Sequence, residues 1–433
     1  MTDGREEEEK GYLGPSFRRG LERRRFLDRI LRGLGIGAIL TSIAALLVLF
    51  GTIVQTSATA FTQTQIRVPV FVDPDVVDPS GSGDASVIAS ADYRRLVHHG
   101  LETLLGEPPS RRAGREMRAI LSMVAEFRLR DRVSETHSLI GRSIDLWVPA
   151  SSDVDLAVKG IVPMGGSEPG RLSERQVDWV RRLERDGHLV TKFNRDFFLS
   201  GHSQEPEAAG IRGAVLGSAL MLFVTLAIAL PIGIAAAVYL EEFAPRNGWT
   251  ELIDVNIRNL AAVPSIVFGI LGLAVFLNLA GLPRSTPLVG GLVLALMTLP
   301  TIIITARAAV GAVPPSLREA ALQLGASRLQ ATFLVMLPNA LPGILTGAII
   351  GAAQALGETA PLLMIGMVAF IAGSPNDLLD PAAPLPVQIY LWSTSPERGF
   401  VEKTAAGIVV LLVFLVLMNG MAVLLRNRTQ KTG

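Results

Sequence analysis

The sequence predicts a mainly α-helical, polytopic membrane protein with six transmembrane helices and an inserted α+β domain between the first and second spans. Its 433 residues are 49% hydrophobic and 18% charged, with a mean hydropathy of +0.41. This composition is too apolar for a typical soluble enzyme and too charged for a chain lying wholly in lipid. Six apolar runs are long enough to cross a bilayer, which takes about 20 residues. Residues 56–210 contain no such run.

The first 55 residues predict a cytoplasmic tail, 1–32, and a first transmembrane helix, 33–55. The tail holds an acidic run at 6–9, which predicts a disordered start, and then a basic juxtamembrane helix. A cleaved signal peptide is the alternative, because Ala58-Thr59-Ala60 resembles a cleavage site. The apolar run exceeds the usual ~7–15 residues, which favours a retained anchor. The N-terminus is expected in the cytoplasm because arginines precede the span, namely Arg18, Arg19, Arg23, Arg24, Arg25, Arg29 and Arg32.

Residues 56–210 predict the α+β domain, on the far side of the membrane. Strands are expected at 66–70, 144–148 and 189–193, helices at 92–105, 115–130 and 174–185, and a loop at 78–84. A Ser173/Gln176 capping box marks the start of the last helix. His98 and His99 are adjacent and cannot both easily reach one metal from a helix, so we interpret them as solvated. No catalytic constellation is evident here.

The remaining chain predicts a core of five spans, 211–425, and a cytoplasmic tail, 426–433. The spans are expected at 213–240, 259–281, 287–311, 341–372 and 404–425. Trp249, Leu252 and Ile257 predict a short interfacial helix before the third span, and Pro264 is expected to bend the chain there. The tail should lie in the cytoplasm with the N-terminus. Glycine and proline recur inside the spans, which suits a gated bundle more than a simple anchor.

Residues 312–340 form a mildly charged loop between two apolar runs. Ser316 and Glu319 have the spacing of a capping box and predict the start of a short helix. Gly325 can adopt the positive φ that ends such a helix. Ser327 can cap a second helix that ends at 337–338. The loop is therefore expected to be two short helices at an angle beside the membrane.

Glu358 is the conspicuous acid in the fifth predicted span, with Gln354 and Thr359 close in sequence. A carboxylate near the bilayer centre costs roughly 2.5–3.5 kcal/mol on insertion scales, so it should avoid lipid. We expect it to face a pore, a partner subunit or a neutralising group. A protonated or hydrogen-bonded glutamate that joins two helices is the structural alternative.

Several functions are excluded by composition and motif. The chain has no cysteine, which excludes disulfides, thiolate metal sites and cysteine catalysis. A net charge of +1 gives no reason to expect a nucleic-acid partner. The phosphate-binding loop motif G-x-x-x-x-G-K-[ST] does not occur, so ATP hydrolysis requires another polypeptide.

The loop at 312–340 has the spacing E-A-A, three residues, G, nine residues, I or V, one residue, L-P. This spacing resembles the cytoplasmic loop of ABC importer permeases, with Val335 at the position of the usual isoleucine. The matching residues are Glu319, Ala320, Ala321, Gly325, Val335, Leu337 and Pro338. GETAPLL at 357–363, VPSIVFGILGL at 263–273, YLEEFAP at 239–245 and LPTIIIT at 299–305 narrow the resemblance to PstA-type permeases of phosphate-specific ABC importers. Residues 56–210 resemble the extended N-terminal domain of a subset of them.

The resemblance implies a type I ABC importer permease core that moves inorganic phosphate across the bacterial cytoplasmic (inner) membrane. It implies a homologous second permease (PstC-type), an ATPase dimer (PstB-type) that binds ATP and Mg, and a periplasmic phosphate-binding protein (PstS-type). No cofactor is expected in this chain. The matching loop residues are the expected ATPase-coupling residues, and Gln354, Glu358 and Thr359 are candidates for the translocation pathway. Many relatives carry arginine where this chain has Gln354, so no anion-binding role is carried over to it.

Other functions remain as alternatives. A permease for another oxyanion has the same sequence features, because spans carry little substrate information. A secondary transporter is less favoured because no inverted repeat is evident. A membrane receptor would need an output domain, which the short cytoplasmic segments do not supply. An intramembrane enzyme is disfavoured because the spans contain no paired aspartates, H-E-x-x-H motif or Ser/His pair.

Overall fold

A computed structural model describes residues 15–106, 108, 110–165, 172–368, 371 and 373–431. The chain divides into two compact units, 1–55 and 56–433, which we describe separately. In the first unit the chain is helical from Pro15, as part of helix α2 (Pro15–Ala60). The helix contains an apolar window of mean hydropathy 2.4, so it is long and apolar enough to cross a membrane. The predicted helical span is confirmed, and the acidic run at 6–9 lies outside the described residues.

The second unit begins with a three-stranded antiparallel sheet in the order β2-β1-β3. Its strands are β1 (Thr62–Phe71), β2 (Ser143–Pro149) and β3 (Leu189–Phe193), which confirms all three predicted strands. Ile66, Val68 and Val70 alternate along β1 and are completely buried. Pro69 is tolerated in the central strand because β3 pairs only with residues 62–66. The missing amide of Pro69 therefore lies beyond the end of β3.

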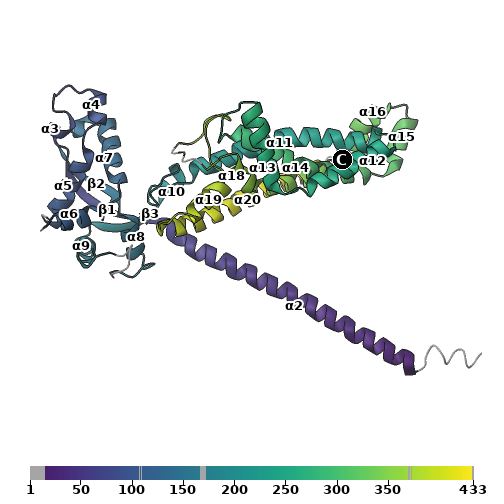
Figure 1. The fold of residues 1–433 in the computed structure, drawn as a ribbon, viewed down its shortest axis with the longest axis horizontal. Coiled ribbons are helices and arrows are strands. Elements are labelled where there is room, and N and C mark those ends of the chain that lie inside the picture. Colours follow the sequence, from purple (N-terminus) through teal and green to yellow (C-terminus); the bar gives the residue numbers. More distant parts are fainter. Residues whose placement is uncertain are drawn as a thin grey trace, which may run out of the picture. The chain divides into compact units, whose positions relative to one another are not determined.

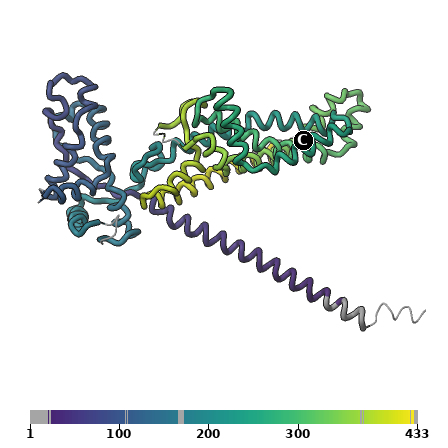
Figure 2. The backbone as a smooth tube through the Cα atoms, viewed as in Figure 1, coloured from purple at the N-terminus to yellow at the C-terminus, as the bar shows by residue number. Residues whose placement is uncertain are grey.

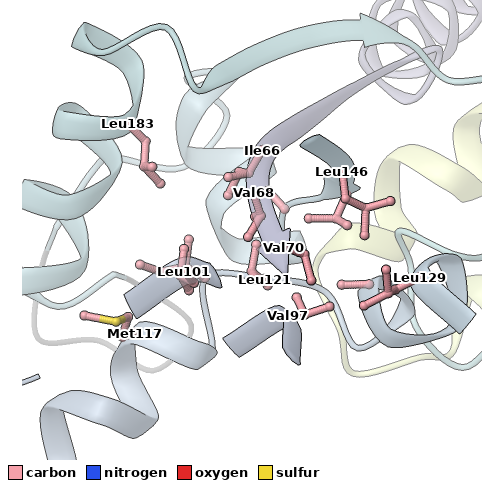
Figure 3. Close-up of a cluster of buried hydrophobic side chains, with 14 of the residues drawn as sticks. Ile66, Val68, Val70, Val97, Leu101, Met117, Leu121, Leu129, Leu146 and Leu183 are labelled. Carbon is pink, nitrogen blue, oxygen red and sulfur yellow. The ribbon is translucent and has the colours of Figure 1, made fainter. Parts of the chain in front are cut away.

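Helices pack against this sheet and bury its apolar face. Figure 3 shows Val97, Leu101 and Leu129 gathered around β1. Gly100 lies directly against the backbone of Pro69, where a side chain would collide with the carbonyl oxygen. The helices and turns of this region are α3 (Pro74–Val77), α4 (Ala85–Ala89), α5 (Tyr93–Leu105), α6 (Arg111–Arg118), α7 (Val124–Glu135), η1 (His137–Leu139), α8 (Ser152–Val158), α9 (Glu174–Arg185) and α10 (Arg195–Leu199).

Most of the expected helices of this domain are confirmed, but one is wrong. The helix expected at 115–130 is divided into α6 and α7 by residues 119–123. Leu121 forms a β-bridge with Ala150, and the Ser122 amide donates a hydrogen bond to the Pro149 carbonyl (3.1 Å). Pairing with the end of β2 thus satisfies backbone groups that a continuous helix would have used internally. The Ser173/Gln176 capping box is present as predicted.

The remaining residues form a helix bundle, which Figures 1 and 2 show as closely packed, roughly parallel rods. Gly291 on α14 abuts Val224 on α11, and Gly347 on α17 abuts Thr305 on α14, so glycine allows close approach at both contacts. The helices and turns are α11 (Arg212–Val238), η2 (Tyr239–Phe243), α12 (Gly248–Ala261), α13 (Ser265–Gly272), η3 (Leu273–Leu279), α14 (Pro287–Gly311), α15 (Pro315–Gln323), α16 (Arg328–Ala331), η4 (Thr332–Met336), α17 (Leu337–Gly357), α18 (Ala360–Met364), α19 (Leu385–Ser393) and α20 (Gly399–Lys431).

Among the described residues, five helices are long and apolar enough to cross a membrane, or six if a bent pair counts as one span. That pair is α12 with the helix from Ser265 to Leu279, and the two halves meet at 98°. The bend predicted at Pro264 is therefore confirmed, and so is the helix before it. Pro264 is the N-cap of α13, where its missing amide costs no helical hydrogen bond.

The fifth span is displaced from its expected position at 341–372. Its helix begins at Arg328, continues through the π-helical turn η4, and ends at Gly357. The prediction that a short helix ends at Leu337 and Pro338 is therefore wrong. Pro338 lies in the first turn of α17, immediately after η4, where an altered hydrogen-bond pattern accommodates the missing amide.

Buried charges join the α+β domain to the last helix. The Lys159 Nζ atom lies 2.6 Å from Asp155 Oδ2 and 3.1 Å from Glu402 Oε1 on α20. The Thr64 amide donates to the other carboxylate oxygen of Asp155 (2.7 Å). All three charged side chains are at least 90% buried. Such a cluster is costly to break because removing one member leaves an uncompensated charge.

A further buried acid, Glu207, lies in the same region. Its backbone carbonyl accepts a hydrogen bond from Gln63 Nε2 (2.8 Å), and the residue is 7% exposed. Burial raises the pKa of the Glu207 carboxyl to about 7; its backbone hydrogen bond and the Ser122 hydroxyl oppose the shift, while Glu205 and Glu397 add to it. Protonation therefore favours the folded state.

We predict that this acid makes stability pH-dependent. Since burial raises its folded-state pKa above the ordinary value of 4.5, its contribution is complete below pH 4.5 and is lost as the pH rises through 7. The effect has an upper limit of about 3 kcal/mol. Thermal unfolding of the detergent-solubilised chain between pH 6 and 8.5 should show a smaller loss of Tm in Glu207→Gln than in wild type. The exposed-site variant Glu184→Gln should behave as wild type; an unchanged pH profile in Glu207→Gln would contradict the assignment.

Candidate functional site

The helix pair at 315–331 is largely exposed. Gly325 separates α15 from α16 with a φ of +89°, which confirms the expected positive φ. Ser327 and Gln330 form a reciprocal capping box, so the predicted cap of the second helix is also confirmed. The capping box expected from Ser316 and Glu319 is wrong. Pro315 begins the helix one residue earlier, because its fixed φ suits the first helical position.

The expected coupling residues lie in two different settings. Glu319 and Ala320 are exposed and Ala321 is half-buried on α15. Val335, Leu337 and Pro338 belong to the continuous helix that begins at Arg328. Large apolar side chains are exposed around the glycine turn, with Leu324 89% exposed. The others are Leu317, Leu322, Leu329, Phe333 and Leu334. A group of this kind is typical of a surface that another protein covers.

Ion pairs fasten the base of this helix pair to the bundle. Arg318 Nη1 on α15 lies 3.0 Å from Glu242 Oε2, whose side chain is 7% exposed. Arg307 on α14 bonds Glu241 through its Nε atom (3.1 Å) and Asp254 on α12 through Nη1. Two neighbouring acids in η2 thus bind α14 and α15, and Asp254 joins α12 to the same arginine of α14.

Sequence reasoning missed Arg307 and its partners. The available signal was an arginine near the end of an apolar span, where a charge is expected to have a partner. The sequence alone does not show which carboxylates pair with Arg307, because Glu241 and Asp254 are 66 and 53 residues away. The two adjacent acids of the π-helical turn η2 pair with arginines of two different helices. Such turns are frequent at functional sites.

The residues expected in the translocation pathway lie at a break in the fifth span. Gln354 is exposed on α17, and its Oε1 accepts from the Thr301 hydroxyl on α14 (3.2 Å). Glu358 is not inside a helix, as the sequence had suggested, but has extended backbone (φ −83°, ψ 123°) directly after α17. Thr359 is the N-cap of the short helix α18 (Ala360–Met364). Glu358 and Thr359 therefore form one irregular segment, and Gln354 lies in the last turn of the helix before it.

Packing holds the far side of this break in place. A side chain at Gly269 on α13 would lie 2.7 Å from the Pro361 Cα atom, so α13 and α18 are in close backbone contact. Glu358 is half-buried, and no described residue forms a hydrogen bond or ion pair with its side chain. Irregular backbone within a bundle needs support from protein or a polar cavity. The segment thus combines a fixed backbone with polar side chains available for a ligand.

Among the described residues, no group of three or more His, Asp and Glu side chains could hold a metal ion. The polar groups at the break are amide, hydroxyl and carboxylate, which can exchange hydrogen bonds with a small polar solute.

Comparison with known proteins gives two family matches. Residues 229–431 match the family described as binding-protein-dependent transport system inner membrane component. Residues 18–167 match a domain of unknown function, DUF3333. The second match overlaps most of the α+β domain, so similarity assigns that part no role.

Individual relatives match the bundle region. A probable ABC transporter permease protein of Bacillus subtilis, YqgI, is 33% identical over 54% of this chain and 83% of its own length. The phosphate transport system permease protein PstA of Pasteurella multocida is 31% identical over 53% of this chain and 82% of its own length. An inward-facing structure of the MetNI methionine ABC transporter superimposes with a TM-score of 0.43 at 20% identity, over 51% of this chain and 95% of that chain. The two sequence relatives are thus matched over most of their own length.

We predict that Arg307→Gln destabilises the bundle by about 1–3 kcal/mol, because Glu241 and Asp254 then lose a shared cation. The matched control is Arg258→Gln, whose 70% exposed side chain pairs only with Asp254 within α12. Thermal unfolding of the solubilised variants should show a lower Tm for Arg307→Gln and little change for Arg258→Gln. Equal effects in the two variants would show that the arginine does not clamp the helices.

Proposed function

The chain belongs to the family of binding-protein-dependent transport system inner membrane components, and from this premise we propose that it carries inorganic phosphate across the bacterial inner membrane. It is a multi-pass permease of the ABC importer type. The choice of phosphate as the substrate rests on the similarity of the bundle to relatives named as phosphate transport permeases. The polar break at Gln354, Glu358 and Thr359 is the proposed part of the translocation pathway.

The proposed complex contains three further kinds of subunit. ATP hydrolysis belongs to a separate ATPase dimer that binds ATP and Mg, since this sequence lacks the phosphate-binding loop motif. A homologous second permease and a periplasmic phosphate-binding protein complete the importer. The exposed apolar side chains around Leu324 support the ATPase as the protein that covers the helix pair.

The proposed orientation places both termini and the helix pair in the cytoplasm. Arginines before the first span and after the last span support it, because basic residues concentrate in cytoplasmic segments. The α+β domain then lies on the periplasmic side, where it is joined to the start of α20.

A single helix supports mechanical coupling between the ATPase and the pathway. It runs from Arg328, just after the glycine turn, to Gly357, just before Glu358. Thirty residues of helix span about 45 Å. Movement of the helix pair would therefore shift the break itself, while the Arg318–Glu242 pair transmits the same movement to η2.

We predict that Gly325→Val uncouples ATP hydrolysis from transport. A β-branched residue at φ +89° costs about 1–2 kcal/mol or more and would redirect α16. The site itself is open, since no atom lies within 4 Å of an added Cβ, so insertion should be preserved. Gly248→Val is the control: that glycine is also open but does not have a positive φ. Normal phosphate uptake and substrate-stimulated ATPase activity in Gly325→Val would refute the coupling role.

We predict that Glu358→Gln lowers ATP-dependent phosphate uptake at least tenfold while subunit assembly remains intact. The change replaces a half-buried carboxyl group at the break by an amide of nearly the same shape. Uptake of labelled phosphate by the reconstituted complex should be compared with assembly measured by copurification, and Glu251→Gln on α12 serves as an exposed control. Uptake that falls only in proportion to lost complex would assign Glu358 to helix packing. If uptake were blocked by an excess of another oxyanion but not by unlabelled phosphate, the other oxyanion would be the substrate.

A further inference from the structure

Three arginines line one cavity in the α+β domain, outside the helix bundle. The cavity has a volume of about 320 Å³, and Arg94, Arg115 and Arg118 contribute to its wall together with His98. Helix α5 supplies Arg94 and His98, and α6 supplies the other two arginines. The break between α6 and α7 closes the cavity with the buried Ser122. A pocket of this size is at the lower end of the range for small-molecule sites, about 300–1,000 Å³.

The local sequence explains why these cations converge. Arg94 and His98 are four residues apart on α5, so they share one face, which borders the buried face that carries Val97 and Leu101. Arg115 and Arg118 are three residues apart on α6 and share a face in the same way. The segment at 119–123, which pairs with the end of β2, brings the first turn of α7 to the same place. That turn is the positive end of a helix dipole.

The three arginine side chains of the cavity wall have no acidic partner among the described residues. Within the described residues, none of them forms a side-chain hydrogen bond or ion pair. By contrast, Arg112 bonds Glu116 (3.1 Å) and Arg128 bonds Asp196. Glu126 is the one acid among the residues that line the cavity. The wall therefore carries three positive charges against one negative charge, which is an arrangement that attracts anions.

Two adjoining hollows share arginines with this cavity. One of about 550 Å³ is also lined by Arg94, His98 and Arg118, with Arg95 beside them; its acids are Asp73, Asp92 and Glu102. The other is lined by Arg111, Arg115 and Arg118. Arg118 is half-buried and borders all three hollows. It is therefore the central cation of the group.

The imidazole of His98 reports the same positive environment. Burial, together with the charges of Arg94 and Arg118, lowers its pKa to about 4, against a smaller opposite effect of Asp92. His98 is thus neutral at physiological pH and retains one hydrogen-bond donor and one acceptor. It can bond a ligand without adding a fourth cation.

We propose that this cavity binds a small multivalent oxyanion, such as inorganic phosphate or another phosphate- or sulfate-bearing small molecule. Guanidinium groups match the geometry of such oxygens with paired, charge-assisted hydrogen bonds. A small solute fits better than an acidic protein surface, because the arginines surround a concavity and Arg118 and Ser122 are withdrawn from the outer surface. The proposal goes beyond transport through the bundle: it gives the α+β domain a ligand of its own.

The test is anion binding by the full-length chain in detergent. Isothermal titration with inorganic phosphate, pyrophosphate and sulfate separately should give saturable binding for at least one of them. Arg118→Gln on α6 and Arg94→Gln on α5 should each weaken that binding at least tenfold, or about 1.4 kcal/mol. The control is Arg112→Gln, which removes the same charge from α6 but outside the cavity, and it should change the affinity less than twofold.

Each outcome of the titration decides the question. Absence of saturable binding for all three anions overturns the proposal, as does an equal loss in Arg112→Gln, which would indicate a diffuse charge effect. Binding that survives in Arg118→Gln and Arg94→Gln, but is lost in Glu358→Gln, would locate the anion in the bundle and leave the transport proposal standing. Thermal unfolding of the variants should be unchanged, which separates loss of the ligand from misfolding. If Arg118→Gln fails to fold, loss of binding in Arg94→Gln makes the same test.

Discussion

The arrangement of the helix bundle depends on the clamp formed by Arg307 with Glu241 and Asp254. A charge near the end of an apolar helix must be paired, and here one cation satisfies acids from two other elements. The neighbouring Arg318–Glu242 pair connects α15 to the same turn. Because Glu241 and Glu242 are adjacent in η2, this turn is joined to both α14 and α15, and Asp254 adds α12 through Arg307.

A second set of ion pairs holds elements together at the other end of the bundle. The cluster of Asp155, Lys159 and Glu402 is buried where α8 meets α20, so it specifies one way for these elements to meet. Its members make hydrogen bonds as well as ion pairs, including the one from the Thr64 amide. The α+β domain is thus joined to the bundle by contacts that tolerate little rearrangement, whereas the arginine-lined cavity lies among α5, α6 and α7 within the domain itself.

Much of the candidate site was predictable from local pattern, and the remainder was not. Gly325 and Ser327 were recognisable because a positive φ and a helix cap are requirements of neighbouring residues alone. The capping box predicted at Ser316 is not formed, because proline at the first helical position is a stronger local signal for the start of a helix. Glu358 was expected within a helix because the apolar run continues past it; the contact of Pro361 with Gly269 instead supports a break.

The sequence by itself determined which segments are apolar enough to span a membrane, which residues alternate in β1, and which turn carries the loop signature, because these properties repeat at fixed spacing along the chain. Only the tertiary structure decided which acids pair with Arg307, where the fifth span ends, and that arginines from α5 and α6 line one cavity. The physical reason is that ion pairing and close packing join residues separated by many positions, and periodicity within one element contains no information about its neighbours.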